Sequence, residues 1–344
     1  MSQPVVAPRP YPMSWVDHIL RAVQRARIPN WAFYAALFAV GHALVVALRV
    51  RDGLPLDQAL LVPPPVFLVW AVYLLAMTQY LNAVARERLG RFRAAIEVDD
   101  AEYGDMAYRL TTMPAVPTLL NGVLWVVIGG AILLTAKATV LALGYPVWEV
   151  WLTIATYFLG GAVIYHTVHQ LREVSRLFAR VQQIDLYRLD PLHAFAGLTA
   201  QSALGWIFLL YATTLLVPRE LETAAVDATW LVVAAVAVAA FVVPLVGMHR
   251  RLVAAKHRAL VANSTRLRRA MEAVHDAIDG DAPERLDGLG KVVATLLGEK
   301  ERLARVSTWP WEAGTLRGFV TALLLPLLLR VGQQALERAM GMGR

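Results

Sequence analysis

The chain has 344 residues, of which 58% are hydrophobic, no cysteine and a formal net charge of +7. Soluble domains are roughly 45–50% apolar, so this composition favours a membrane protein. The absence of cysteine excludes disulfides, thiolate metal sites and a cysteine nucleophile. The positive charge alone would suit nucleic acid, but its placement along the chain favours a membrane surface, and no nucleic-acid partner is expected.

The N-terminal segment, residues 1–30, begins rich in proline and continues as a predicted helix over residues 14–27, with Ser14 as its N-cap. One face of this helix is apolar. It comprises Trp15, Ile19, Leu20 and Val23. Such a helix is typical of the membrane interface, with its polar side toward the cytosol. No cleavable signal pattern precedes it, so the first span is expected to direct insertion.

Six stretches are long and apolar enough to cross the roughly 30 Å hydrocarbon core of a bilayer as helices. They are residues 31–48, 60–81, 116–136, 150–169, 194–217 and 228–248. Together they form a predicted transmembrane domain, residues 31–248, with polar segments at residues 83–115 and 170–193. A basic helix, residues 171–187, is expected to continue from the fourth span.

Residues 249–311 are predicted to form a helical bundle outside the membrane. Apolar residues recur every seven positions, at Val253, Leu260, Leu267 and Val274. A second amphipathic helix is expected from Pro283 to about residue 306. Because these apolar seams need partners, the bundle, together with residues 170–190, is expected to mediate self-association.

The positive charges predict the orientation. Of the 33 Lys and Arg residues, 26 fall in the N-terminal segment, the polar segments 83–115 and 170–193, and residues 249–317. Loops rich in Lys and Arg remain on the cytoplasmic side. The N-terminus and the long helical extensions are therefore predicted to be cytoplasmic, in a plasma or inner membrane.

The final segment, residues 312–344, predicts a short seventh membrane helix. Its apolar run, residues 318–329, rises only about 18 Å, and Arg317 and Arg330 bracket it. Interface anchors precede it: Trp309, Pro310 and Trp311.

The outer half of this helix is polar. Arg330, Gln333, Gln334 and Glu337 lie within about one quadrant of the helix. Contact of this polar face with lipid would cost free energy, whereas contact with a water-filled axis would not. The alternative places residues 330–344 beyond the bilayer. In the first case, an apolar constriction of the pore would be formed by Leu324, Leu325 and Leu328.

No phosphate-binding loop, zinc-protease motif or nucleophile elbow occurs in the sequence, so no enzyme activity and no cofactor are expected. His166 and His169 are interpreted as an interfacial pair with hydrogen-bond partners. Asn121 and Gln201 are neutral polar residues inside spans. They either join helices by hydrogen bonds or line the midplane pocket of a transporter.

The layout resembles the seven-transmembrane ion channel superfamily that includes insect odorant and gustatory receptors. The shared features are cytoplasmic helical extensions, here 170–193 and 249–278, and a split seventh helix, here 283–306 and 314–340. The family's seventh-helix signature is replaced by Thr315-Leu316 and Gln333-Gln334. The resemblance implies a homo-oligomer, commonly of four subunits, with a cytoplasmic anchor.

The sequence therefore predicts an all-α polytopic membrane protein with six full spans, a split seventh helix and long cytoplasmic extensions. We expect a homo-oligomeric ion channel whose partners are the lipid bilayer, copies of itself and ions. The alternatives are a non-conducting scaffold or sensor, which would recruit a partner through its helical bundle, and a small-molecule transporter.

Overall fold

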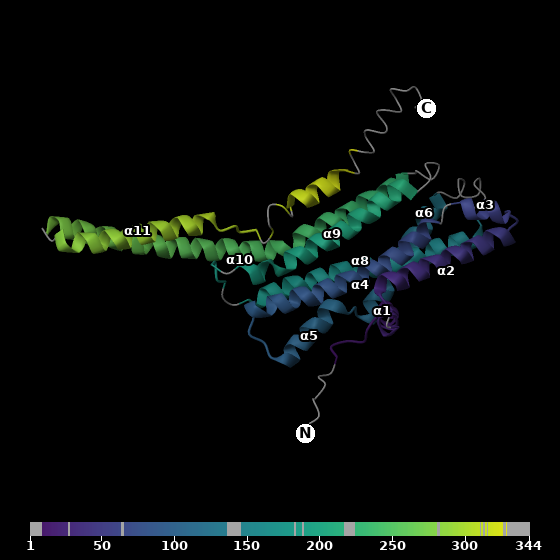
Figure 1. Ribbon diagram of the computed structural model, residues 1–344, viewed down its shortest axis with the longest axis horizontal. Coiled ribbons are helices and arrows are strands. Elements are labelled where there is room, and N and C mark those ends of the chain that lie inside the picture. Colours follow the sequence, from purple (N-terminus) through teal and green to yellow (C-terminus); the bar gives the residue numbers. More distant parts are fainter. Residues whose placement is uncertain are drawn as a thin grey trace, which may run out of the picture.

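The computed structural model describes residues 9–26, 28–62, 65–135, 146–181, 184–187, 189–216, 224–280, 283–309, 311, 314, 316–325 and 328. Within these ranges the secondary structure is helical, apart from one isolated β-bridge between Met13 and Pro114. The molecule is elongated, with a bundle of long helices at one end and a two-helix projection at the other (Figure 1).

The helices are α1 (Trp15–Arg25), α2 (Asn30–Arg51), α3 (Leu56–Leu61), α4 (Val66–Phe92), η1 (Arg93–Ala95), α5 (Asp100–Thr111), α6 (Ala115–Thr135), α8 (Val147–Arg180), α9 (Asp190–Leu216), α10 (Ala224–Asp279) and α11 (Pro283–Arg305). A short apolar helix, Leu316–Leu325, follows α11 and is called the last helix below. Among the described helices, six are long and apolar enough to cross a membrane: α2, α4, α6, α8, α9 and α10. This confirms the predicted all-α class, and the six helices overlap the six predicted spans.

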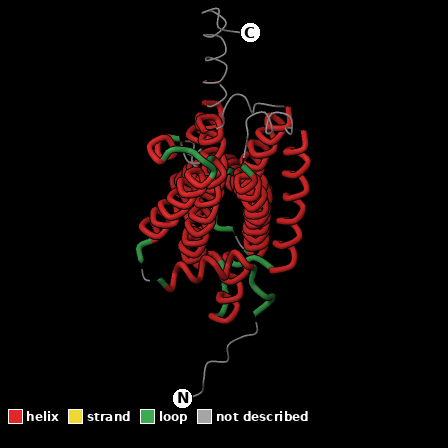
Figure 2. The backbone as a smooth tube through the Cα atoms, turned by 90° about the vertical axis from the view of Figure 1, so that its right-hand side faces the viewer, coloured by secondary structure: helices red, strands yellow, loops and turns green. Residues whose placement is uncertain are grey.

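Four of these helices form a closed ring. α4 and α10 each pack against both α8 and α9, and the long helices run side by side in the view along the molecule (Figure 2). α9 is the most enclosed, since 67% of its apolar stretch is buried, against 17% for α2 and α6. α2 and α6 therefore form the periphery, where apolar side chains are left for lipid.

The second span differs from its predicted limits. Residues 56–61 form the separate helix α3, and α4 begins only at Val66, directly after Pro65. A proline suits the position just before or within the first turn of a helix. At its other end α4 continues to Phe92, where the ring of Phe92 packs on Phe178 and Phe195 at centroid distances of 5.8 and 5.1 Å. This aromatic contact stabilises the extra turns of α4 against α8 and α9.

α6 lies close against α8 because glycine allows it. A Cβ atom at Gly161 would lie 2.6 Å from the carbonyl oxygen of Asn121, and one at Gly129 would lie 2.5 Å from the Tyr157 ring. Such small residues let helix backbones approach in membranes. Gly130, by contrast, has nothing within 4 Å. Of these two neighbouring glycines, only Gly129 is therefore needed for the contact.

α10 is a continuous helix of 56 residues with Pro244 inside it, and α11 folds back along its distal part (Figure 1). The seam between them contains a buried amide. Asn263 is 1% exposed, and its Nδ2 donates to the Leu296 carbonyl oxygen at 3.2 Å and to Glu299 Oε2 at 2.8 Å. This pair of helices, residues 256–305, is called the hairpin below.

Two basic side chains of α10 cap neighbouring helices. Arg251 donates from one nitrogen to the carbonyl oxygens of Phe178 and Val181, at 2.7 and 2.8 Å. Lys256 donates to the carbonyl oxygens of Ala304 and Val306, at the end of α11, at 2.7 and 2.9 Å. Cations there satisfy carbonyls that have no partner within their own helix. α8 accordingly ends at Arg180, earlier than the predicted residue 187.

α1 docks against the connection between α5 and α6. Ser14 and Asp17 form a capping box, and Asp17 Oδ2 also accepts from the backbone nitrogen of Met113 at 2.9 Å. Val16 is fully buried, but Ile19, predicted on the apolar face, is 40% exposed. The helix therefore buries the side that faces protein, which periodicity alone does not distinguish from a lipid-facing side.

Candidate functional site

The segment that leads into the last helix is fixed by a column of five stacked rings. The order is His249, Trp309, Trp311, Phe241 and Phe319, with successive centroid distances of 3.9, 4.2, 5.1 and 4.2 Å. All four pairs lie within 20° of parallel. We call this set the aromatic column. It joins α10 to the last helix through the two tryptophans that the sequence singled out as anchors.

A hydrogen bond holds the first ring of the column. The Nδ1 atom of His249 lies 2.9 Å from the Thr308 carbonyl oxygen. A carbonyl only accepts, so this ring nitrogen carries the proton and donates. The tryptophans are thus placed by protein contacts to α10, in addition to any contact with a membrane interface.

The last helix packs on the bundle along one side. Phe319 is 6% exposed, and the Tyr211 hydroxyl of α9 donates to the Ala322 carbonyl oxygen at 3.3 Å. The opposite side carries the residues predicted to form a pore constriction. Leu324, Leu325 and Leu328 are 46%, 45% and 65% exposed. They are therefore available to lipid, to water or to another copy of the chain.

The rest of the predicted pore lining, Arg330, Gln333, Gln334 and Glu337, lies outside the described residues, as does the anchor Pro310. The predicted extension of the last helix to residue 340 lies there too. These predictions stand as the sequence made them.

A cleft of about 600 Å³ lies between α4, α9 and the last helix. We call it the α4–α9 cleft. Its wall is mostly aromatic and aliphatic, with contributions from Tyr73, Met77, Tyr80, Gln201, Leu204, Gly205, Phe208, Tyr211 and Ala322. Its signal in the sequence was the seven-residue spacing of Tyr73 and Tyr80 on one helix and of Gln201 and Phe208 on the other. Residues seven apart share a helix face.

The two polar residues that a transporter would use are separated. Gln201 lines the α4–α9 cleft, and its Oε1 atom is buried with no hydrogen-bond partner among the described residues. Asn121 instead donates from Nδ2 to the Gly161 carbonyl oxygen, which joins α6 to α8. The midplane pocket expected around both residues is therefore not formed in the described part of the chain.

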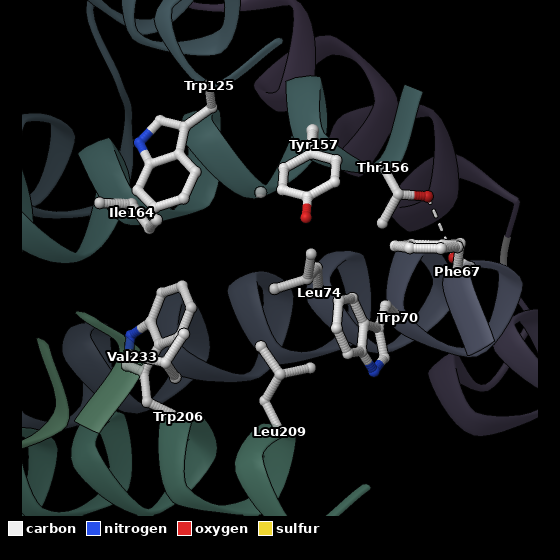
Figure 3. Close-up of a pocket in the computed structure, with 11 residues that line it drawn as sticks. Phe67, Trp70, Leu74, Trp125, Thr156, Tyr157, Ile164, Trp206, Leu209 and Val233 are labelled. Carbon is white, nitrogen blue, oxygen red and sulfur yellow. Dashed lines mark hydrogen bonds between the residues drawn. The ribbon is translucent and has the colours of Figure 1, made fainter. Parts of the chain in front are cut away.

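A second, smaller cavity of about 60 Å³ is lined by residues of α4, α6, α8, α9 and α10. Figure 3 shows its wall, with the indoles of Trp70, Trp125 and Trp206 and the ring of Tyr157 at different sides of the space. Its one dashed hydrogen bond runs from the Thr156 hydroxyl to the Phe67 carbonyl oxygen at 3.1 Å. A space of this size is far below that of a small-molecule site, which takes roughly 300–1,000 Å³.

The two histidines of α8 have hydrogen-bond partners. His166 is 1% exposed, and its Nε2 lies 2.8 Å from Asn82 Oδ1. His169 Nε2 lies 3.0 Å from the Arg109 carbonyl oxygen and 3.1 Å from the Tyr11 hydroxyl. These bonds join α8 to α4, α5 and the N-terminal segment, so the pair has a structural explanation. Burial raises the pKa of the Tyr11 hydroxyl, which remains protonated and donates to the Thr112 carbonyl oxygen at 2.8 Å.

Within the described residues no group of three or more His, Cys, Asp or Glu side chains could hold a metal ion. Comparison of the chain with family models, with curated proteins and with solved structures found no match. The class is therefore defined by the described helices alone. They form an all-helical protein with six helices long and apolar enough to span a membrane, which is compatible with an integral membrane protein.

Proposed function

We propose that this protein is an integral membrane protein that assembles from several copies into an ion channel, with the last helix lining the pore. The observation that supports the proposal is the one-sided attachment of the last helix. Phe319 fixes it to the bundle, whereas Leu324, Leu325 and Leu328 remain exposed. Around a symmetry axis these leucines would form an apolar constriction, which can gate by dewetting.

The predicted charges beyond the constriction support the same arrangement. Arg330 costs several kcal/mol within a leaflet unless it reaches water or pairs with another charge. Glu337 follows seven residues later and shares its helix face, so it could pair with Arg330 within or between subunits. A ring of unpaired arginines at this position would favour anions over cations.

Recording from purified protein in planar bilayers tests the proposal. Conductance is expected, and Arg330→Glu should shift the reversal potential in a salt gradient toward cation selectivity. Arg51→Glu is the matched control, because Arg51 carries the same charge at the end of the peripheral helix α2. Absence of conductance, or last helices on the lipid-facing rim of the oligomer, would defeat the channel proposal.

The proposed orientation has the N-terminus and the hairpin on the cytoplasmic side. A cysteine-free chain makes single-cysteine labelling simple. A thiol introduced at Asp57, exposed on α3, should react with an impermeant reagent applied outside the cell. A thiol at Arg268 of the hairpin should react only after permeabilisation. The reverse pattern would invert the topology.

A non-conducting scaffold is the second candidate, and the hairpin supports it. Apolar residues are exposed along its length, including Val261, Met271 and Ile278 on α10 and Val292 and Leu297 on α11, at 38–57%. Such side chains suit association with copies of the chain or with another protein. Light scattering in detergent should reveal an oligomer that a chain without residues 256–305 does not form. Monomer alone for the intact protein would count against the channel, whereas a scaffold that recruits another protein is expected to be monomeric or dimeric.

A further inference from the structure

The α4–α9 cleft has the size and the lining of a small-molecule site. Its volume of about 600 Å³ falls within the roughly 300–1,000 Å³ of ligand pockets, which are mainly apolar with a few placed polar groups. Three residues at its rim remain accessible in the single chain. Tyr80, Leu204 and Phe208 are 53%, 42% and 57% exposed. Because they lie on spans α4 and α9, the mouth opens sideways, where a bilayer would place lipid.

Two polar groups of the cleft lack partners among the described residues. The Oε1 atom of Gln201 is buried and accepts no hydrogen bond, and the Tyr80 hydroxyl makes none. The other two hydroxyls of the wall are engaged, since Tyr73 donates to the Gly205 carbonyl oxygen at 2.8 Å and Tyr211 to that of Ala322. Removed from water, an unpaired amide oxygen is costly. The buried Oε1 atom of Gln201 therefore lacks a hydrogen-bond donor from the described residues.

Among the described residues that line the cleft, none carries a charge. A charged ligand would lose its hydration there without a compensating partner, which is strongly unfavourable. An uncharged molecule with an apolar body meets no such penalty. Its body would lie against the rings of Tyr73 and Phe208, and a hydroxyl or N–H group would reach Gln201.

We propose that the α4–α9 cleft binds a small uncharged amphiphile that enters from the bilayer and donates one hydrogen bond to Gln201. The occupant also touches the last helix at Ala322, so binding is placed to affect that helix. The binding site itself does not depend on the channel function, and its test measures binding alone.

The experiment uses the full chain in lipid vesicles and two photoreactive probes, octanol carrying a diazirine and the matching octane without the hydroxyl. Labelled peptides are identified by mass spectrometry. The octanol probe is expected to label the two peptides that contain residues 73–80 and 201–211. Gln201→Leu should weaken that labelling about five- to tenfold, the effect of one neutral hydrogen bond. Labelling by the octane probe should not change.

Ser202→Ala is the matched control. Ser202 is adjacent, buried and also without a partner for its hydroxyl, but it does not line the cleft. It should leave labelling unchanged. Leu204→Trp fills the mouth from the exposed rim and should block both probes, which keeps the test decisive if Gln201→Leu does not fold.

Competition identifies the source of the natural occupant. Displacement by octanol added from water points to a small soluble alcohol, and displacement by diacylglycerol in the vesicles points to a lipid. The proposal is overturned if neither competes, if Gln201→Leu labels like the unaltered chain, or if label falls equally on the peripheral helices α2 and α6.

Discussion

Trp311 is the residue whose removal should most directly release the last helix. It is the central ring of the aromatic column, 4.2 Å from Trp309 and 5.1 Å from Phe241. Each aromatic pair contributes about 1 kcal/mol beyond the area it buries. Trp311→Ala deletes two pairs, so it should weaken docking of the last helix by at least about 2 kcal/mol, or roughly 30-fold in the docking equilibrium.

A single cysteine reports this equilibrium, because the chain has none of its own. Leu323 is partly buried against the core, so a thiol at this position reacts more slowly while the helix is docked. Its labelling rate should rise in Trp311→Ala, by up to about 30-fold if the docked helix protects it fully. The rate at Leu325, which is 45% exposed, should hardly change. Trp31→Ala is the control for losing a tryptophan, since Trp31 is 76% exposed. An unchanged rate at Leu323 would refute the idea that the column holds the helix.

Three further substitutions test packing and electrostatics. Gly161→Ala should destabilise by about 1–3 kcal/mol, because its Cβ would meet a backbone oxygen at 2.6 Å, whereas Gly130→Ala should be neutral or stabilising; thermal melts compare them. Asn263→Leu should lower hairpin stability by about 1–2 kcal/mol, because it removes the hydrogen bonds to the Leu296 carbonyl oxygen and to Glu299; an unchanged or higher melting temperature would mean that the unpartnered Oδ1 atom dominates. Burial raises the pKa of Asp17, so its contribution to stability is full below about pH 4 and is lost as pH rises through the folded pKa. Asp17→Asn should therefore flatten this dependence in melts from pH 4 to 8, while Asp17→Ala should cost about 1–2 kcal/mol by removing the hydrogen bonds that Asp17 accepts from Ser14 and Met113.

Hydropathy and charge were enough to predict the six long helices and the break between α10 and α11, because both depend on local composition. The packing partners were not predictable in the same way. Arg251 was one of a run of basic residues, and only the structure places it at the end of α8, where it caps the carbonyl oxygens of Phe178 and Val181. Likewise, Gln201 and Asn121 looked equivalent in sequence. They differ in the structure because Asn121 faces α8 and bonds to it, whereas Gln201 faces the α4–α9 cleft.

Because α10 is continuous, a small rotation at one point of the helix moves its far end. The aromatic column contacts α10 at Phe241 and His249, and the helix continues for 30 residues beyond His249 to Asp279. At 1.5 Å per residue this arm is about 45 Å long. A tilt of about 5° at the column would carry its tip through about 4 Å, by the same helical rise. A tilt of α10 that is too small to change contacts within the bundle would thus still move the far end of the hairpin by a measurable distance.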